Sequence, residues 1–174
     1  MKIYLDMDGV IADFLGALEK RFNVDHWKDL EDPQLTIRGL KNTDWFFHLD
    51  EFKSSTKLVN AVRELAGQNY GICSSPIQRD DYNSAYWKRR WLEEHDFMPK
   101  VSNFVITSNK WKFAHEEISG EPNILVDDKP DNIHRWEAAG GNGILYQANK
   151  DDVEDLIGDL EWAYNSMARF GQYS

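Results

Sequence analysis

Short apolar runs alternate with amphipathic stretches along most of this chain. The apolar runs lie at residues 1–5, 70–73, 104–107, 123–126 and 143–146, and each has the length of a buried strand. Elsewhere apolar residues recur three and four positions apart, which predicts helices over residues 11–22, 57–65, 82–95, 111–118, 132–139 and 152–170. Strands that alternate with helices predict an α/β fold, in which a parallel sheet is covered by helices on both faces.

One segment interrupts this alternation. Between the first predicted helix and residue 57 the chain breaks into polar and aromatic pieces, punctuated by Pro33 and Gly39. We therefore expect a core domain built from residues 1–14 and 58–174, with residues 15–57 inserted as a small helical cap after the first strand. We find no internal repeat and no low-complexity segment in the sequence.

Polar residues follow the predicted strands at the ends where α/β proteins bind ligands. In chain order they are Asp6, Asp8 and Gly9, then Ser74 and Ser75, then Lys110, and finally Asp127 and Asp128. The set offers a carboxylate nucleophile, a second carboxylate for proton transfer, hydroxyl donors, a cation, and two further carboxylates that suit a hard metal ion. These groups together favour phosphoryl transfer, for which charge neutralisation is the main requirement.

Each of these residues also has a structural interpretation. Asp6 and Asp8 would serve as an acidic turn, Ser74 and Ser75 as caps of local backbone, and Asp127 and Asp128 as a helix start. Lys110 alone would be an ordinary surface lysine, and Lys112 competes with it for the same role. Because all of these residues fall at strand ends, we favour the catalytic interpretation of the set over the structural one.

The motifs at 6–10 (DMDGV), Ser74, Lys110 and 127–128 resemble the four signature motifs of the haloacid dehalogenase superfamily, in order and in spacing. The stretches 6–14 (DMDGVIADF), 44–50 (DWFFHLD), 72–77 (ICSSPI) and 124–131 (ILVDDKPD) are similar to the 5′(3′)-deoxyribonucleotidases. The resemblance implies a Rossmann-like core with a small cap, and a Mg²⁺-dependent phosphatase acting on nucleoside monophosphates.

The resemblance also implies roles for single residues. Asp6 would attack phosphorus, and Asp8 would protonate the departing oxygen and later activate water. Mg²⁺ would be held by Asp6, the backbone carbonyl of Asp8, and Asp127 or Asp128, of which we favour Asp128. Ser74, where these nucleotidases more often have threonine, would donate a hydrogen bond to the phosphoryl group, and Lys110 would balance its charge.

Substrate selection is expected to fall to the cap. Trp45, Phe46 and Phe47 are candidates to stack on a nucleobase, and Phe14 is a weaker one, although cap packing is the competing interpretation of each. Gln78, Ser84 and Ser108 stand where these nucleotidases usually carry basic residues, and Arg79 is a candidate to compensate for them.

Composition narrows the set of partners. The formal net charge of −10 disfavours duplex nucleic acid, so the basic and aromatic residues at 86–91 are expected to form an ordinary amphipathic helix with a charged solvent face. The lone Cys73 excludes an internal disulfide and is expected in the core rather than as a nucleophile. The sequence shows no membrane segment, predicts a cytoplasmic protein and leaves a homodimer open.

The sequence thus predicts a magnesium-dependent nucleotidase. Three alternatives remain: a phosphatase for another small phosphomonoester such as a sugar phosphate, a hydrolytic dehalogenase, and a nucleotide-binding protein without turnover. The dehalogenase is disfavoured because that reaction has no use for Asp8 or for the carboxylates after the fourth strand.

Overall fold

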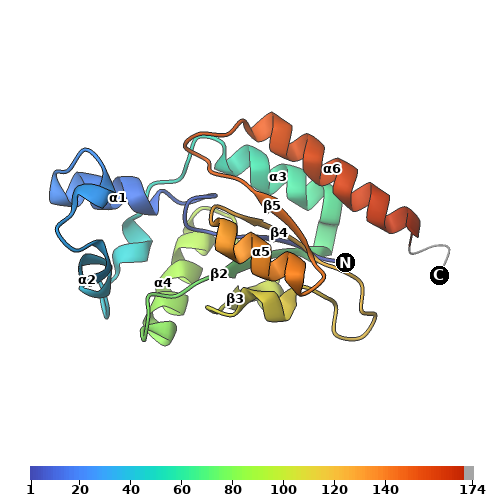
Figure 1. The fold of residues 1–174 in the computed structure, drawn as a ribbon, viewed down its shortest axis with the longest axis horizontal. Helices are drawn as coiled ribbons and strands as arrows, with labels where there is room; N and C mark the ends of the chain where they lie inside the picture. The colour runs from blue at the N-terminus through green and yellow to red at the C-terminus, as the bar shows by residue number, and fades with distance from the viewer. Residues whose placement is uncertain (171–174) are drawn as a thin grey trace.

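A computed structural model describes residues 1–170. Its centre is a parallel sheet of five strands in the order β3-β2-β1-β4-β5 (Figure 1). The strands are β1 (Ile3–Leu5), β2 (Tyr70–Ser74), β3 (Phe104–Ile106), β4 (Ile124–Asp127) and β5 (Asn142–Leu145). The expectation of an α/β fold with a parallel sheet is confirmed.

The strand register brings the chemistry-bearing residues to one edge. Leu5 at the end of β1 pairs with Ile72 of β2 and Val126 of β4. The residues that follow these positions therefore leave the sheet side by side at its carboxyl edge, although they are far apart in the sequence.

Helices cover both faces of the sheet because side chains of successive strand residues point in opposite directions. On one face, Ile3 and Leu5 join a large core with apolar residues of α3 (Ser55–Ala66), α4 (Asp81–Glu94) and α6 (Val153–Phe170). On the other face, Tyr4 and Cys73 pack with Trp136 of α5 (Pro130–Ala138) and with the 3₁₀ turn η5 (Lys110–Phe113).

The segment between β1 and α3 contains only short helical elements: α1 (Phe14–Phe22), α2 (Pro33–Arg38) and the 3₁₀ turns η1 (Trp27–Asp29) and η2 (Trp45–His48). Figure 1 shows α1 and α2 at one end of the molecule, beyond the sheet. The segment rejoins the core through η2, which packs on α4. The division into a core domain and a cap of residues 15–57 stays a prediction.

Two predicted helices differ from the observed ones. The first begins at Phe14 rather than Ile11, because the amides of Ile11 and Ala12 both donate to the carbonyl of Met7 and close a turn instead. The helix expected over 111–118 is absent: after η5 the chain forms a bridge between His115 and Pro122, and Ile118 is fully exposed.

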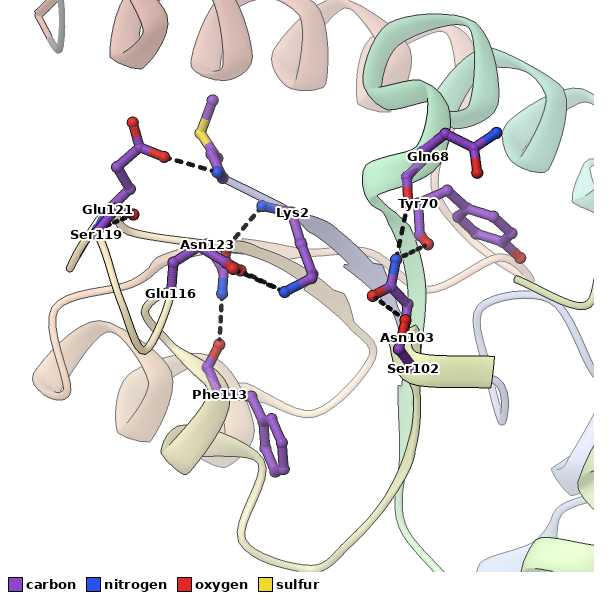
Figure 2. A network of polar contacts seen from close by, with 11 residues as sticks. Lys2, Gln68, Tyr70, Ser102, Asn103, Phe113, Glu116, Ser119, Glu121 and Asn123 are labelled. Atoms are coloured by element: carbon purple, nitrogen blue, oxygen red, sulfur yellow. Dashed lines mark hydrogen bonds and ion pairs between the residues drawn. The ribbon is translucent and has the colours of Figure 1, made fainter. Parts of the chain in front are cut away.

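The amino edge of the sheet, opposite the chemistry, is closed by side-chain hydrogen bonds (Figure 2). Asn103, in the 3₁₀ turn η4 (Val101–Asn103), donates from Nδ2 to the carbonyls of Gln68, in the 3₁₀ turn η3 (Gly67–Asn69), and Tyr70, at 2.9 and 3.1 Å. Asn123 accepts the amide of Lys2 at 2.6 Å and donates to the carbonyl of Phe113 at 3.0 Å. The buried polar groups at this edge are therefore paired. Within residues 1–170, no helix has the length and apolar character needed to cross a bilayer.

Candidate active site

Asp6 occupies the first position after β1 and is buried at the carboxyl edge of the sheet. Its Oδ2 lies 2.9 Å from Nζ of Lys110, which reaches the site from η5 and is itself buried. Burial alone would raise the pKa of Asp6, but the Lys110 and Lys88 ammonium groups outweigh it and hold that pKa below its usual range. Asp6 is thus an ionised carboxylate at neutral pH, as a nucleophile requires.

Lys110 also pairs with Asp127, whose Oδ2 lies 2.6 Å from its Nζ. The remaining acceptor capacity of Asp127 is used by the amide of Lys129 at 2.9 Å and by Nδ2 of Asn132 at 3.0 Å. Lys112, the rival for the role of Lys110, is exposed on the outside of η5. The structure therefore places Lys110, and not Lys112, between the two carboxylates.

Asp128 differs from Asp127 in its lack of partners. Its Oδ1 is buried and accepts no hydrogen bond from any residue in 1–170. Burial, together with the negative charge of Asp6, raises the pKa of Asp128 to about 7. A buried carboxylate oxygen without a donor is unfavourable unless a cation occupies the space beside it.

Asp6, Asp127 and Asp128 each offer an oxygen within 4.8 Å of the others. All three donors are carboxylates, the ligand type that Mg²⁺ and Ca²⁺ prefer. The residues present therefore fit a divalent cation, and the unpartnered Oδ1 marks Asp128 as the member with a free ligand atom.

Gly9 allows Asp128 to lie close to the loop that follows β1. Its φ is +81°, and a Cβ added there would lie 2.5 Å from Oδ2 of Asp128. Only glycine combines this backbone conformation with such a close approach. Gly9 therefore lies directly against Asp128, a member of the cluster of three carboxylates.

Asp8 and Ser74 are joined by Lys88. Nζ of Lys88 lies 2.6 Å from Oδ2 of Asp8 and 2.7 Å from Oγ of Ser74. Burial, opposed by Lys88 and reinforced by Asp6, raises the pKa of Asp8 above its ordinary value. Asp8 therefore holds a proton more readily than Asp6 does.

Sequence reasoning missed Lys88, and the expectation that it lies on a charged solvent face was wrong. It is 0 % exposed, whereas its neighbours Arg89 and Arg90 are exposed. The signal that identifies it is helical spacing, because the buried residues Ser84, Lys88 and Trp91 follow one another at intervals of four and three along α4.

The remaining predicted residues lie around this centre. Phe46 is buried beneath Lys88, with Nζ 4.4 Å from the ring centroid, and Phe14 is buried against it. Trp45 stays partly exposed and meets Phe14 edge-on. Ser75 is half-buried after β2, and Arg79 is exposed on the loop that follows, with a φ of +62°. Arg79 forms neither an ion pair nor a side-chain hydrogen bond with residues 1–166, whose side chains the structure describes.

Cys73 is fully buried in β2, where burial raises the pKa of its thiol to about 12. The thiol is therefore protonated at neutral pH and faces the α5 side of the sheet. Its expected place in the core is confirmed.

The chain is similar to known 5′(3′)-deoxyribonucleotidases. The chain is 28% identical over 156 residues to the mitochondrial 5′(3′)-deoxyribonucleotidase of Mus musculus, and 26% identical over 156 residues to that of Homo sapiens. It is 28% identical over 147 residues to a putative 5′(3′)-deoxyribonucleotidase of Bordetella bronchiseptica. Each alignment covers 75% of this chain.

The chain spans 66% and 63% of the length of the mouse and human relatives, and 75% of the bacterial one. A solved structure, a hydrolase from Streptococcus pneumoniae TIGR4, has the same fold with a TM-score of 0.51 at 14% identity, over 92% of this chain and 97% of that one. The sequence model of the family described as "5' nucleotidase, deoxy (Pyrimidine), cytosolic type C protein" matches residues 1–165, so the chain belongs to this family.

Proposed function

We propose that this protein is a divalent-metal-dependent phosphatase that hydrolyses nucleoside monophosphates, with deoxyribonucleotides as the main substrates. The observation that carries the proposal is the environment of Asp6. This ionised carboxylate is paired with Lys110 at 2.9 Å and lies in a cluster of acidic oxygens at the carboxyl edge of the sheet. Family membership and the names of the deoxyribonucleotidase relatives support the choice of substrate.

The proposed reaction has two steps. In the first, a carboxylate oxygen of Asp6 attacks phosphorus, the bond from phosphorus to the sugar oxygen breaks, and Asp8 gives its proton to that oxygen. In the second, Asp8 takes a proton from water as the water oxygen attacks the aspartyl phosphate, which releases inorganic phosphate and restores Asp6. The raised pKa of Asp8 and the lowered pKa of Asp6 support this division of roles.

The other residues bind and orient the phosphoryl group in this proposal. Ser74 donates its hydroxyl hydrogen to a phosphoryl oxygen, while Lys110 balances the negative charge that gathers near Asp6. Mg²⁺, held by Asp6, the backbone carbonyl of Asp8 and Asp128, would supply further charge neutralisation at the phosphoryl oxygens. Asp127 is saturated by Lys110, Lys129 and Asn132, which supports Asp128 as the direct ligand.

Trp45 is the proposed stacking residue for the nucleobase. It remains partly exposed, whereas Phe46 is covered by Lys88 and Phe14 is buried. Base stacking on an aromatic face tolerates different bases, so Trp45 supports nucleotide binding without selecting a base. A cytoplasmic location and a homodimer remain predictions; two of the relatives are named mitochondrial.

Replacement of Asp6 tests the proposal. Asp6→Asn keeps the shape of the side chain but removes the nucleophile, so we expect hydrolysis of deoxyribonucleoside monophosphates to fall at least about 1,000-fold. The control is Asp159→Asn on the exposed side of α6, which should keep wild-type rates. Acid quenching of the wild-type reaction should trap a phosphorylated protein that is absent in Asp6→Asn.

A substrate panel separates the alternatives in the same experiment. Deoxyribonucleoside monophosphates, ribonucleoside monophosphates and sugar phosphates are compared by kcat/KM. Equal values for sugar phosphates would overturn the nucleotide assignment in favour of a general phosphomonoesterase. Nucleotide binding without turnover by the wild type would overturn the enzymatic assignment altogether.

A further inference from the structure

Lys88 is a fully buried lysine at the centre of the site. Burial of an unpaired ammonium group is strongly unfavourable, and such a group is retained only where it is paired. Its partners come from separate parts of the chain: Asp8 follows β1, Ser74 ends β2, and Phe46 lies in η2 of the insertion. The side chain thus joins the sheet edge to the insertion from α4.

The contact with Asp8 is asymmetric. Lys88 holds Oδ2 at 2.6 Å, while Oδ1 of the same carboxyl group is buried and has no hydrogen-bond partner among residues 1–170. A carboxyl group fixed at one oxygen cannot rotate without loss of a short, charge-assisted hydrogen bond. Oδ1 is therefore the oxygen left to exchange a proton with a ligand.

The contact with Ser74 likewise restricts the direction in which that side chain can form its other hydrogen bond. The Lys88 ammonium group has only donors, so the Ser74 oxygen must accept at 2.7 Å. The single hydroxyl hydrogen of Ser74 then points to some other acceptor. The carboxylate of Asp6, or a phosphoryl oxygen beside it, would offer such an acceptor.

We infer that Lys88 is a positioning residue for proton transfer, which holds Oδ2 of Asp8 so that Oδ1 faces the departing oxygen of the substrate. The inference rests on the proposed function, because it assigns a task within the phosphoryl-transfer step. Loss of the ammonium group would leave Asp8 free to turn, and proton delivery to the leaving group would slow.

Leaving groups that differ in their need for a proton make the inference testable. The alkoxide of a nucleoside leaves poorly unless it is protonated, whereas p-nitrophenolate leaves without a proton. Because kcat/KM extends only to the first irreversible step, it reports the transfer to Asp6, in which Asp8 acts as the acid. The ratio of kcat/KM values for a deoxyribonucleoside monophosphate and p-nitrophenyl phosphate therefore measures proton delivery.

Lys88→Met removes the ammonium group while it fills nearly the same space. We expect kcat/KM for the nucleotide to fall at least about 100-fold, the size of a general-acid effect, and that for p-nitrophenyl phosphate to fall less than about tenfold. Asp8→Asn should show the same substrate-selective loss. Arg89→Met, on the exposed side of the same helix, is the matched control and should retain both rates.

Equal losses for the two substrates would overturn the inference, because they would show that Lys88 acts on the phosphoryl group or on the fold. Unchanged rates would overturn it as well. Should Lys88→Met fail to fold by circular dichroism, Lys88→Gln, which keeps a polar group beside Asp8 and Ser74, is measured by the same criterion. A wild-type protein inactive on every phosphomonoester would instead refute the proposed function, so the two failures are distinguishable.

Discussion

Gly9 shows how much of the site depends on single positions. Its backbone has φ +81°, and the space where a Cβ would lie is taken by Oδ2 of Asp128 at 2.5 Å. Gly9 is thus needed for two reasons: it adopts the positive φ of the turn, and it leaves room for the Asp128 carboxylate. These two effects are separated when a substitution at Gly9 is compared with the same substitution at a glycine that has a positive φ but no close neighbour.

Gly9→Ala is expected to lose stability and metal affinity together. The positive φ costs about 1–2 kcal/mol for a residue with a side chain, and the added methyl group must push Asp128 aside. Gly120→Ala is the matched control, because its φ is +69° and no atom lies within 4 Å of the added Cβ.

Urea unfolding should show a loss of about 1–2 kcal/mol for Gly120→Ala and a larger loss for Gly9→Ala, because only the latter adds a close contact with Asp128. Activity titrated with Mg²⁺ after treatment with EDTA should require at least about tenfold more metal only in Gly9→Ala, as expected for displacement of a ligand carboxylate. Wild-type Mg²⁺ dependence in Gly9→Ala would contradict the placement of Asp128 at the metal.

The sequence predicted which residues follow the strands, and it missed the residue that reaches them from a helix. Asp6, Ser74, Asp127 and Lys110 could be placed together because the ends of parallel strands share an edge. Lys88 stands beside two arginines on an amphipathic helix, and composition gives no sign that it points inward. Its burial depends on Asp8 and Ser74, which are distant in sequence.

Among the elements, strands and long helices were predicted well, and the short connections less so. The pattern over 111–118 has apolar spacing typical of a helix, but the chain there turns back on itself. The amide of Glu116 donates to the carbonyl of Glu121 across a turn at Gly120, which is positive in φ. The Ser-Gly turn signal therefore overrode the periodicity, since local turn chemistry decides short segments.

The elements at the amino edge of the sheet are held by Asn103, which joins η4 to η3 and to the start of β2. It is 4% exposed, and its Nδ2 group donates to the carbonyls of Gln68 and Tyr70. Asn103→Asp exchanges this donor for an oxygen that faces two carbonyl oxygens. We expect a loss of about 2–4 kcal/mol in the free energy of unfolding, because buried acceptors would be left unpaired.

Urea denaturation measures this loss, and kcat for the nucleotide at 25 °C should remain at the wild-type value because the edge is remote from the chemistry. Ser102→Ala is the control: its exposed hydroxyl makes only a 3.4 Å contact with Oδ1 of Asn103, so stability should change by less than about 0.5 kcal/mol. Equal stability of Asn103→Asp and wild type would show that the two carbonyls do not depend on this donor.

At the scale of the whole molecule, the two edges of the sheet are built differently. Polar side chains at the amino edge are paired with backbone groups, as Asn103 and Asn123 show. At the carboxyl edge Asp8 and Asp128 keep buried oxygens that find no partner in the part of the chain that the structure describes. The parallel sheet and its helical crossovers follow from the alternation in the sequence, but the strand order and this contrast depend on contacts between distant segments. Because the buried polar groups at the amino edge are paired, the fold can tolerate a group of carboxylates that repel one another at the carboxyl edge.

The sheet also contains buried weak acids, which make the free energy of unfolding depend on pH in alkaline solution. Burial raises the pKa of Cys73 from 9.0 to about 12, and it raises the pKa values of Tyr4 and Tyr70 as well. Between pH 9 and 12 the unfolded chain has lost the thiol proton while the folded protein retains it. The folded state then binds more protons, so the free energy of unfolding must fall as pH rises, by up to about 1.4 kcal/mol per pH unit from this group.

Cys73→Ala tests this linkage. At pH 8 we expect a loss of about 1–2 kcal/mol from the missing sulfur contacts, because neither state is appreciably ionised there. As pH rises from 9 to 11 the wild type should lose stability more steeply than Cys73→Ala, and the two curves should meet within this range, since only the wild type can release the thiol proton on unfolding. Urea denaturation at successive pH values measures both slopes. Parallel curves would mean that the thiol ionises equally in the folded and unfolded chains, and that Cys73 is not isolated from water behind α5.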